Sequence, residues 1–153
     1  MMTIGTPTKD DYDQISVIFN ELHRQHIAYN PDIFRPVTNL ISQQKFNEMV
    51  DKDEIFACRE GNLVTGYLLA TIKESKTHGY SDRKSFCIKE FAVKQGHQGK
   101  GIGRELINFA IRKAKSLKCK DIELSVNPEN KGAIGFYEKV GMKVKNIKYM
   151  MKV

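Results

Sequence analysis

A short glycine-rich segment, Gln98-Gly99-Lys100-Gly101-Ile102-Gly103, does most to limit what this chain can fold into. The apolar run before it, residues 86–93, predicts a strand, and the amphipathic run after it, residues 104–117, predicts a helix. A glycine-rich turn between a strand and a helix exposes backbone N–H groups at the positive end of the helix dipole, where phosphate binds. The segment therefore predicts a phosphate-binding loop; the alternative is an ordinary strand-to-helix turn.

The spacing of the glycines excludes two better-known phosphate loops. A Walker A loop needs Lys and then Ser or Thr directly after its second glycine, whereas Gly101 is followed by Ile102 and Gly103. A dinucleotide-binding fingerprint that starts at Gly99 would need glycine at position 104, where the chain has Arg104. The pattern that remains is Gln-x-x-Gly-x-Gly.

A second informative segment, NPENKGAIGFYEKVGM at residues 127–142, follows a strand-like run at 121–126. Its apolar residues Ala133, Phe136 and Val140 recur at helical spacing. Asn130 is a good N-cap residue, and Gly141 stands where a C-cap glycine belongs. The segment predicts a short capped helix.

In this order and at this separation, the two segments resemble the acetyl-coenzyme A (acetyl-CoA) loop, Gln/Arg-x-x-Gly-x-Gly/Ala, and the Asn-x-x-Ala-x-x-Phe-Tyr-x-x-x-Gly-Phe segment of the GNAT acetyltransferases. The resemblance is strong over residues 86–151, although Met142 replaces the usual Phe and the Pro often found before the loop is missing. It implies an α/β (α+β) fold with a single GNAT-like domain over residues 1–153. The central sheet would be mixed, mostly antiparallel, flanked by helices and splayed between its fourth and fifth strands, with the cofactor in the splay.

The length and composition agree with a single domain and limit the other classes of protein that this chain could belong to. The 153 residues are 41% hydrophobic and 28% charged, which is typical of a soluble globular protein. No apolar stretch is long enough for a membrane span, and no secretory signal is evident. The three cysteines lack metal-ligand spacing and suit reduced thiols, so we expect a cytoplasmic protein without a metal. The net charge of +7 is compatible with nucleic acid, an anionic membrane or a polyphosphate ligand such as coenzyme A.

The pattern along the chain predicts ten elements in the order β-α-α-β-β-β-α-β-α-β, which agrees with the GNAT layout. Strands are expected at residues 3–6, 54–59, 63–72, 86–93, 121–126 and 144–151. Helices are expected from Thr8 to Ile27, from Thr38 to Asp51, over residues 104–117 and from Asn130. The polar residues 73–84 predict an exposed loop.

The resemblance implies a set of acetyl-CoA contacts on the strand, the loop and the second helix. The loop amides would bind the pyrophosphate, and the strand backbone would pair with the pantetheine arm as an added strand. The N–H of Phe91 would polarise the thioester carbonyl. The full set is Phe91, Ala92, Val93, Gln98, Gly99, Lys100, Gly101, Ile102, Gly103, Arg104, Asn130, Ala133, Phe136 and Tyr137.

Two residues are candidates for proton transfer. Tyr137 matches the tyrosine of the family segment and would protonate the departing thiolate; the alternative is a packing tyrosine. Glu90 would accept the proton of the attacking amine through water; the alternative is a strand glutamate in an ion pair. Other candidate bases are His23, His26 and His97, and an amine can also enter neutral.

The acceptor is expected to be a primary amine, of a small molecule, that attacks acetyl-CoA directly in a ternary complex. Candidate acceptor-binding residues are His26, Tyr29, Phe34 and Tyr80. The first alternative is an acetyltransferase for protein N-termini or lysines. From other classes, a basic nucleic-acid or ribosome-binding module and a non-catalytic acyl-CoA-binding module remain. Scattered basic residues without an aromatic pair at stacking spacing argue against nucleic acid, and we expect no membrane partner. The sequence leaves a homodimer open.

Overall fold

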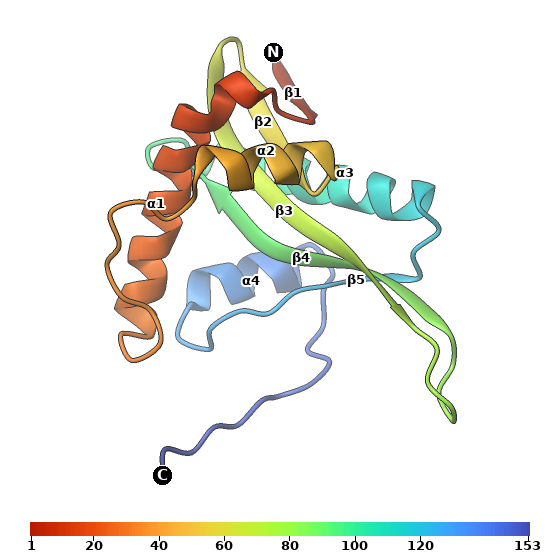
Figure 1. Ribbon diagram of the computed structural model, residues 1–153. Helices are drawn as coiled ribbons and strands as arrows, with labels where there is room; N and C mark the ends of the chain where they lie inside the picture. Colours follow the sequence, from red (N-terminus) through yellow and green to blue (C-terminus); the bar gives the residue numbers. More distant parts are fainter.

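A five-stranded sheet, in the order β1-β2-β3-β4-β5, forms the centre of the computed structural model, which describes residues 1–153 (Figure 1). The first four strands pair antiparallel, and β5 pairs with β4 in parallel. The sheet is therefore mixed and mostly antiparallel, as predicted. Its strands are β1 (Met2–Gly5), β2 (Ile55–Glu60), β3 (Leu63–Ser75), β4 (Arg83–Val93) and β5 (Asp121–Glu123).

Helices cover both faces of the sheet, because alternate strand residues supply an apolar layer to each side (Figure 1). The α1 face, as we call it, packs against α1 (Tyr12–Tyr29) and α2 (Gln43–Asp51) through Tyr67, Leu69 and Ala92. The α3 face packs against α3 (Ile102–Ser116) and α4 (Lys131–Lys139) through residues such as Leu68 and Phe91. Neither these nor any other helix has the length and apolarity required to cross a bilayer.

The first two helices begin later than predicted. Thr8 opens a one-turn 3-10 helix, Lys9–Asp11, in which the Asp11 carboxylate accepts a hydrogen bond from the Thr8 amide at 2.8 Å. Asp11 is buried and forms an ion pair with Arg59 of β2, which fixes the start of α1 against the sheet. The second helix is capped by Ser42 rather than Thr38, since the Ser42 hydroxyl accepts the Lys45 amide at 3.1 Å.

The prediction of an exposed loop over residues 73–84 is wrong at both ends of that range. β3 continues to Ser75 and β4 starts at Arg83, so the two strands form a hairpin that projects from the sheet (yellow-green in Figure 1). Pairs such as Glu74 opposite Lys84 extend the ladder. Polar residues on this solvated part of the hairpin carry no hydrophobic alternation, so no pattern indicated a strand there.

The last predicted strand, residues 144–151, is also wrong for the single chain. Residues 143–153, called here the tail, form no helix or strand and make no backbone hydrogen bond. The strand predicted at 121–126 stops at Glu123. β5 pairs only with β4, so its outer edge has no partner, and the tail runs away from the sheet (dark blue in Figure 1).

Candidate active site

A gap opens between β4 and β5 beside the glycine-rich loop. The two strands pair only from Ser85 to Cys87, whereas β4 continues to Val93 without a neighbour on that side. The pairing register of β3 with β4 shifts at the same place, because Leu69 lies opposite Glu90 and Ala70 opposite Ile88. This bulge bends β4 away from β5, and the predicted splay is therefore present.

The exposed edge of β4 directs backbone groups into this gap. Lys94 donates its amide to the Thr65 carbonyl of β3 at 2.8 Å. Because alternate residues of a strand point their backbone groups to opposite edges, Phe91 and Val93 point theirs to the gap. The carbonyl of Val93 accepts the side-chain amide of Gln98 at 3.4 Å, in agreement with this direction. An extended ligand could therefore pair with β4 here.

The glycine-rich loop presents a continuous run of free amides at the start of α3. None of the backbone N–H groups of residues 98–104 has a hydrogen-bond partner in the protein. Gly99 and Gly101 adopt positive φ values of 76° and 85°, and no protein atom lies within 4 Å of the position that a Cβ would occupy on either. Gly101 is the N-cap of α3, while Lys100 and Arg104 are exposed and form no ion pair. This arrangement fits a phosphate or diphosphate.

Aromatic rings place Tyr137 beside the gap. Phe91 of β4 stacks on Phe136 of α4 with 5.8 Å between ring centroids, and its ring lies 6.1 Å from that of Tyr137. A Cβ on Gly103 would come within 3.3 Å of the Phe136 ring, so the glycine permits the approach of α3 and α4. The Tyr137 hydroxyl has no hydrogen-bond partner, and burial raises its pKa. Tyr137 is therefore a neutral, available proton donor.

The N-terminus of α4 confirms one sequence expectation. The side chain of Asn130 accepts the amide of Ala133 at 3.1 Å, which is an N-cap bond. The same cap orients the helix that carries Phe136 and Tyr137 toward β4.

Glu90 lies on the opposite face from the Phe91 side chain, since neighbouring strand residues point to opposite faces. Its carboxylate accepts the hydroxyl of Tyr67 at 3.2 Å. Tyr67 is fully buried and stacks on Phe19 of α1 with ring centroids 4.4 Å apart. Burial raises the pKa of Glu90, opposed by the bond from Tyr67 and by nearby His23. Sequence reasoning missed Tyr67, because nothing in its apolar strand marks it as a partner of Glu90.

Of the four predicted acceptor residues, the structure brings two together. His26 of α1 lies 4.9 Å from Phe34, ring centroid to ring centroid, and His23 lies 6.0 Å from the same ring. Burial and then the charge of His23 lower the pKa of His26. Tyr29 ends α1 and is half-buried, whereas Tyr80 is 76% exposed in the loop of the β3–β4 hairpin.

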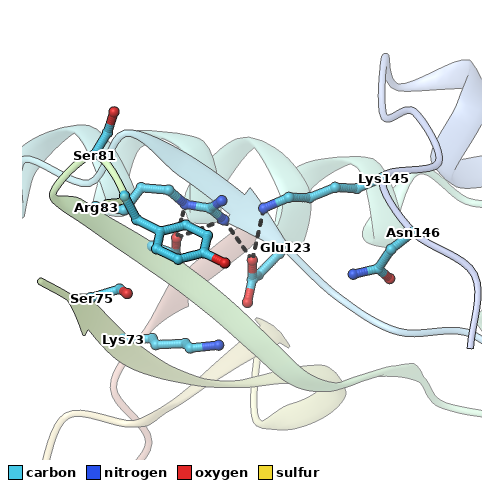
Figure 2. Close-up of a pocket in the computed structure, with 9 residues that line it drawn as sticks. Lys73, Ser75, Ser81, Arg83, Glu123, Lys145 and Asn146 are labelled. Atoms are coloured by element: carbon cyan, nitrogen blue, oxygen red, sulfur yellow. Dashed lines mark hydrogen bonds and ion pairs between the residues drawn. The ribbon is translucent and has the colours of Figure 1, made fainter. Parts of the chain in front are cut away.

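A second, polar cavity of about 390 Å³ lies where the hairpin meets β5, and Tyr80 lines it (Figure 2). Arg83 joins the two strands, with its guanidinium 3.2 Å from the Asp121 carboxylate and 3.0 Å from that of Glu123. The Cys87 thiol donates to Glu123 at 3.3 Å. Sequence reasoning missed this cluster, which lies at the other end of β4 from the glycine-rich loop.

The structure holds no group of three or more His, Cys, Asp or Glu side chains placed to bind a metal ion. His97, an alternative base in the sequence, lies within the loop, and its buried Nδ1 has no hydrogen-bond partner.

Comparison with known proteins shows which family this chain belongs to. The chain is 30% identical over 145 residues to an uncharacterized N-acetyltransferase of Methanocaldococcus jannaschii, covering 95% of this chain and 62% of that protein. A solved tetramutant of a Bacillus halodurans protein matches with a TM-score of 0.91 and 22% identity over 99% of both chains. AAC(6')-Iy, solved with the bisubstrate analog CoA-S-monomethyl-acetylneamine, matches with a TM-score of 0.75 and 17% identity over 100% of this chain and 99% of its own. The model of the acetyltransferase (GNAT) family matches residues 16–142, and this chain therefore belongs to the GNAT family.

Proposed function

We propose that the chain is an N-acetyltransferase that moves the acetyl group of acetyl-CoA to a primary amine of a small molecule. The observation that carries this proposal is the run of free amides at residues 98–104 beside the open edge of β4. A diphosphate and an extended amide-bearing arm would bind to these two features respectively. Coenzyme A carries both groups on one molecule.

In the proposed complex, the loop amides hold the diphosphate, and Lys100 and Arg104 add positive charge. The backbone of Phe91 and Val93 pairs with the pantetheine arm at the gap. Gln98, Ile102, Gly103 and the α4 residues Asn130, Ala133 and Phe136 shape the remaining surface, together with Ala92. Acetyl-CoA supplies a thioester whose carbonyl carbon accepts the amine.

The proposed chemistry uses both faces of β4. The N–H of Phe91 stabilises the negative charge that develops on the thioester oxygen. On the α1 face, Glu90 takes up the proton released as the C–N bond forms, directly or through water. On the α3 face, Tyr137 donates its proton to the sulfur as the C–S bond breaks. The products are an acetylated amine and coenzyme A with a free thiol.

His26 and Phe34, which lie together on the α1 side, are the proposed acceptor contacts, and Tyr29 and Tyr80 remain sequence-based candidates. The aminoglycoside acetyltransferase AAC(6')-Iy supports a small-molecule amine by its bisubstrate complex, although only its fold is shared here. A protein amine and a binding module without turnover are the competing proposals.

The test is thiol release from acetyl-CoA in the presence of a panel of small amines, an N-terminal peptide and a lysine peptide. We expect turnover with at least one small amine and little with the peptides. Turnover confined to a peptide would favour the protein acceptor. Tight acetyl-CoA binding without release on any amine would contradict the enzymatic proposal and favour a binding module.

A further inference from the structure

The polar cavity where the β3–β4 hairpin meets β5 is separate from the proposed acetyl-CoA site. Its volume of about 390 Å³ lies within the size range of small-molecule sites. Arg83 at the start of β4 lines it, whereas the glycine-rich loop follows Val93 at the end of that strand. At roughly 3.3 Å per strand residue, the two ends of β4 lie about 30 Å apart. A ligand in this cavity is therefore a second ligand of the protein.

The cavity lies on the α1 face of the sheet, where the hairpin extends beyond the helices. Lys73 and Ser75 follow Leu69 at even spacing along β3, so they share its face. Their partners across the ladder are Ser85 and Arg83 respectively. The hairpin projects past α1 and α2, and neither helix covers this part of the face (Figure 1). Paired strands thus hold the side chains of the cavity in fixed positions on an open surface.

Positive charge exceeds negative charge in this cavity. Its lining contains one carboxylate, that of Glu123, and three cationic side chains, those of Lys73, Arg83 and Lys145. Ion pairs to Arg83 and Lys145 already hold the carboxylate. Asp121 pairs with Arg83 as well, but Lys73 forms no ion pair. Figure 2 shows Lys73 and Lys145 approaching Glu123 from opposite sides. A cationic ligand would meet like charges here and no free carboxylate.

Hydrogen-bond donors in the cavity also lack acceptors. Nε and Nη2 of Arg83 donate to the Ser85 hydroxyl, and Nη2 also donates to Glu123, but Nη1 makes no hydrogen bond. Ser85 is only 2% exposed, and the proton of its own hydroxyl has no acceptor in the protein. Four more lining side chains make no hydrogen bond, those of Ser75, Tyr80, Ser81 and Asn146. A ligand with several oxygen atoms would satisfy these donors.

We propose that this cavity binds the phosphate monoester of a small polar molecule. Such a group carries about two negative charges at pH 7, which offset the positive excess of the lining. The free Nη1 of Arg83 and the Lys73 ammonium bind the phosphate oxygens, because both groups form charge-assisted hydrogen bonds to phosphate. The serine hydroxyls bind the remaining oxygens. The exposed ring of Tyr80 and the amide of Asn146 flank the organic part of the ligand.

An NMR titration of the full chain with inorganic phosphate and with glycerol phosphate tests the proposal, because backbone amide shifts show where each anion binds. We expect saturable shifts at residues 73–85 and 121–123, with glycerol phosphate binding more tightly than inorganic phosphate. Shifts confined to residues 98–104, or no shifts, would overturn the proposal. Spermidine, a polycation, should cause no saturable shift at the hairpin, and saturation by spermidine alone would also overturn it. The readout is binding, so it does not depend on whether the chain acetylates an amine.

Substitutions with opposite expected effects test the charges of the cavity. Lys73→Gln should weaken the binding of glycerol phosphate about tenfold or more, because it removes a charge-assisted hydrogen bond. Lys76→Gln is the matched control, since Lys76 is an exposed lysine of the same hairpin that does not line the cavity. Its affinity should stay within about twofold of the unchanged protein. Glu123→Gln removes the lining carboxylate and should tighten binding.

Two outcomes would refute the site. One is equal weakening by Lys73→Gln and Lys76→Gln, which would show a general effect of net charge. The other is weaker binding in Glu123→Gln when circular dichroism shows an intact fold. Should Glu123→Gln fail to fold, the comparison of the two lysine variants decides the question alone.

Discussion

The hydroxyl of Tyr67 donates a hydrogen bond of 3.2 Å to the Glu90 carboxylate, from a ring that is fully buried between the sheet and α1. Because the donor favours the charged carboxylate, this bond lowers the pKa of Glu90 against the larger effect of burial, which raises it. The net result is a carboxyl group that keeps its proton to a higher pH than usual. Such a group is well suited to accept and release protons in an acetyl transfer.

Tyr67→Phe tests this balance. Without the hydroxyl, the hydrogen bond that lowers the pKa of Glu90 is lost and the effect of burial remains, so this pKa should rise further. The acid limb of the pH–kcat/KM profile should then move to higher pH. Loss of the bond should also cost about 1 kcal/mol of stability. The profile and a urea unfolding curve are the two measurements. An unmoved acid limb would mean that Glu90 does not govern the pH dependence.

Glu90→Gln should remove the acid limb and lower kcat by roughly 10- to 10⁴-fold, the usual contribution of a general base. It should also change the pH dependence of stability. The pKa of Glu90 in the folded protein lies above its ordinary value of 4.5, so its contribution to stability is present below pH 4.5 and is lost as pH rises through the folded pKa. As pH rises from 4.5 through the folded pKa of Glu90, the Glu90→Gln variant should therefore lose less stability than the unchanged protein. Wild-type kcat in this variant would favour an amine that enters neutral, or another base.

Tyr137→Phe keeps the ring that packs near Phe91 and removes only the hydroxyl. If Tyr137 protonates the leaving thiolate, kcat should fall by roughly 10- to 10⁴-fold. Binding of acetyl-CoA should stay close to that of the unchanged protein, because the proton is needed only as the sulfur departs. Single-turnover kinetics on a verified acceptor and calorimetric binding separate the two effects. An unchanged kcat would leave Tyr137 as a packing residue.

Gly101→Asp should abolish coenzyme A binding, because it places a negative side chain among the free amides that we propose to bind the diphosphate. Gly79→Asp is a matched control, since Gly79 has a φ of 86°, close to the 85° of Gly101, and equally open space, but lies in the hairpin loop. Both variants carry the same backbone strain. The Tm shift caused by acetyl-CoA should disappear only in Gly101→Asp. If Gly101→Asp still bound acetyl-CoA within a few-fold of the wild-type affinity, the phosphates would have to bind elsewhere.

The glycine-rich turn before α3 and the cap of α4 could be predicted because their signals are local. Glycines that adopt positive φ and a capping asparagine act within a few residues of their own positions. The bond between Tyr67 and Glu90 could not be predicted, because it joins residues 23 apart through strand pairing. The polar hairpin ends carried no apolar alternation to reveal them. The alternation of the tail did predict a strand, but a strand also requires pairing, and in the single chain the tail runs away from the sheet without pairing with any strand.

The bulge in β4 adds one residue to the strand without changing the faces on which the flanking side chains lie. Before the bulge, Cys87 shares the α1 face with Thr71; after it, Glu90 shares that face with Leu69, because Lys89 is the extra residue. Deleting Lys89 would make Ile88 and Glu90 regular strand neighbours opposite Ala70 and Leu69, so Glu90 would stay on the α1 face and Phe91 on the α3 face. A one-residue deletion here would therefore remove the bend beside β5 while it left the acid and the aromatic ring in place. The width of the gap and the placement of these two side chains can thus be changed independently of each other.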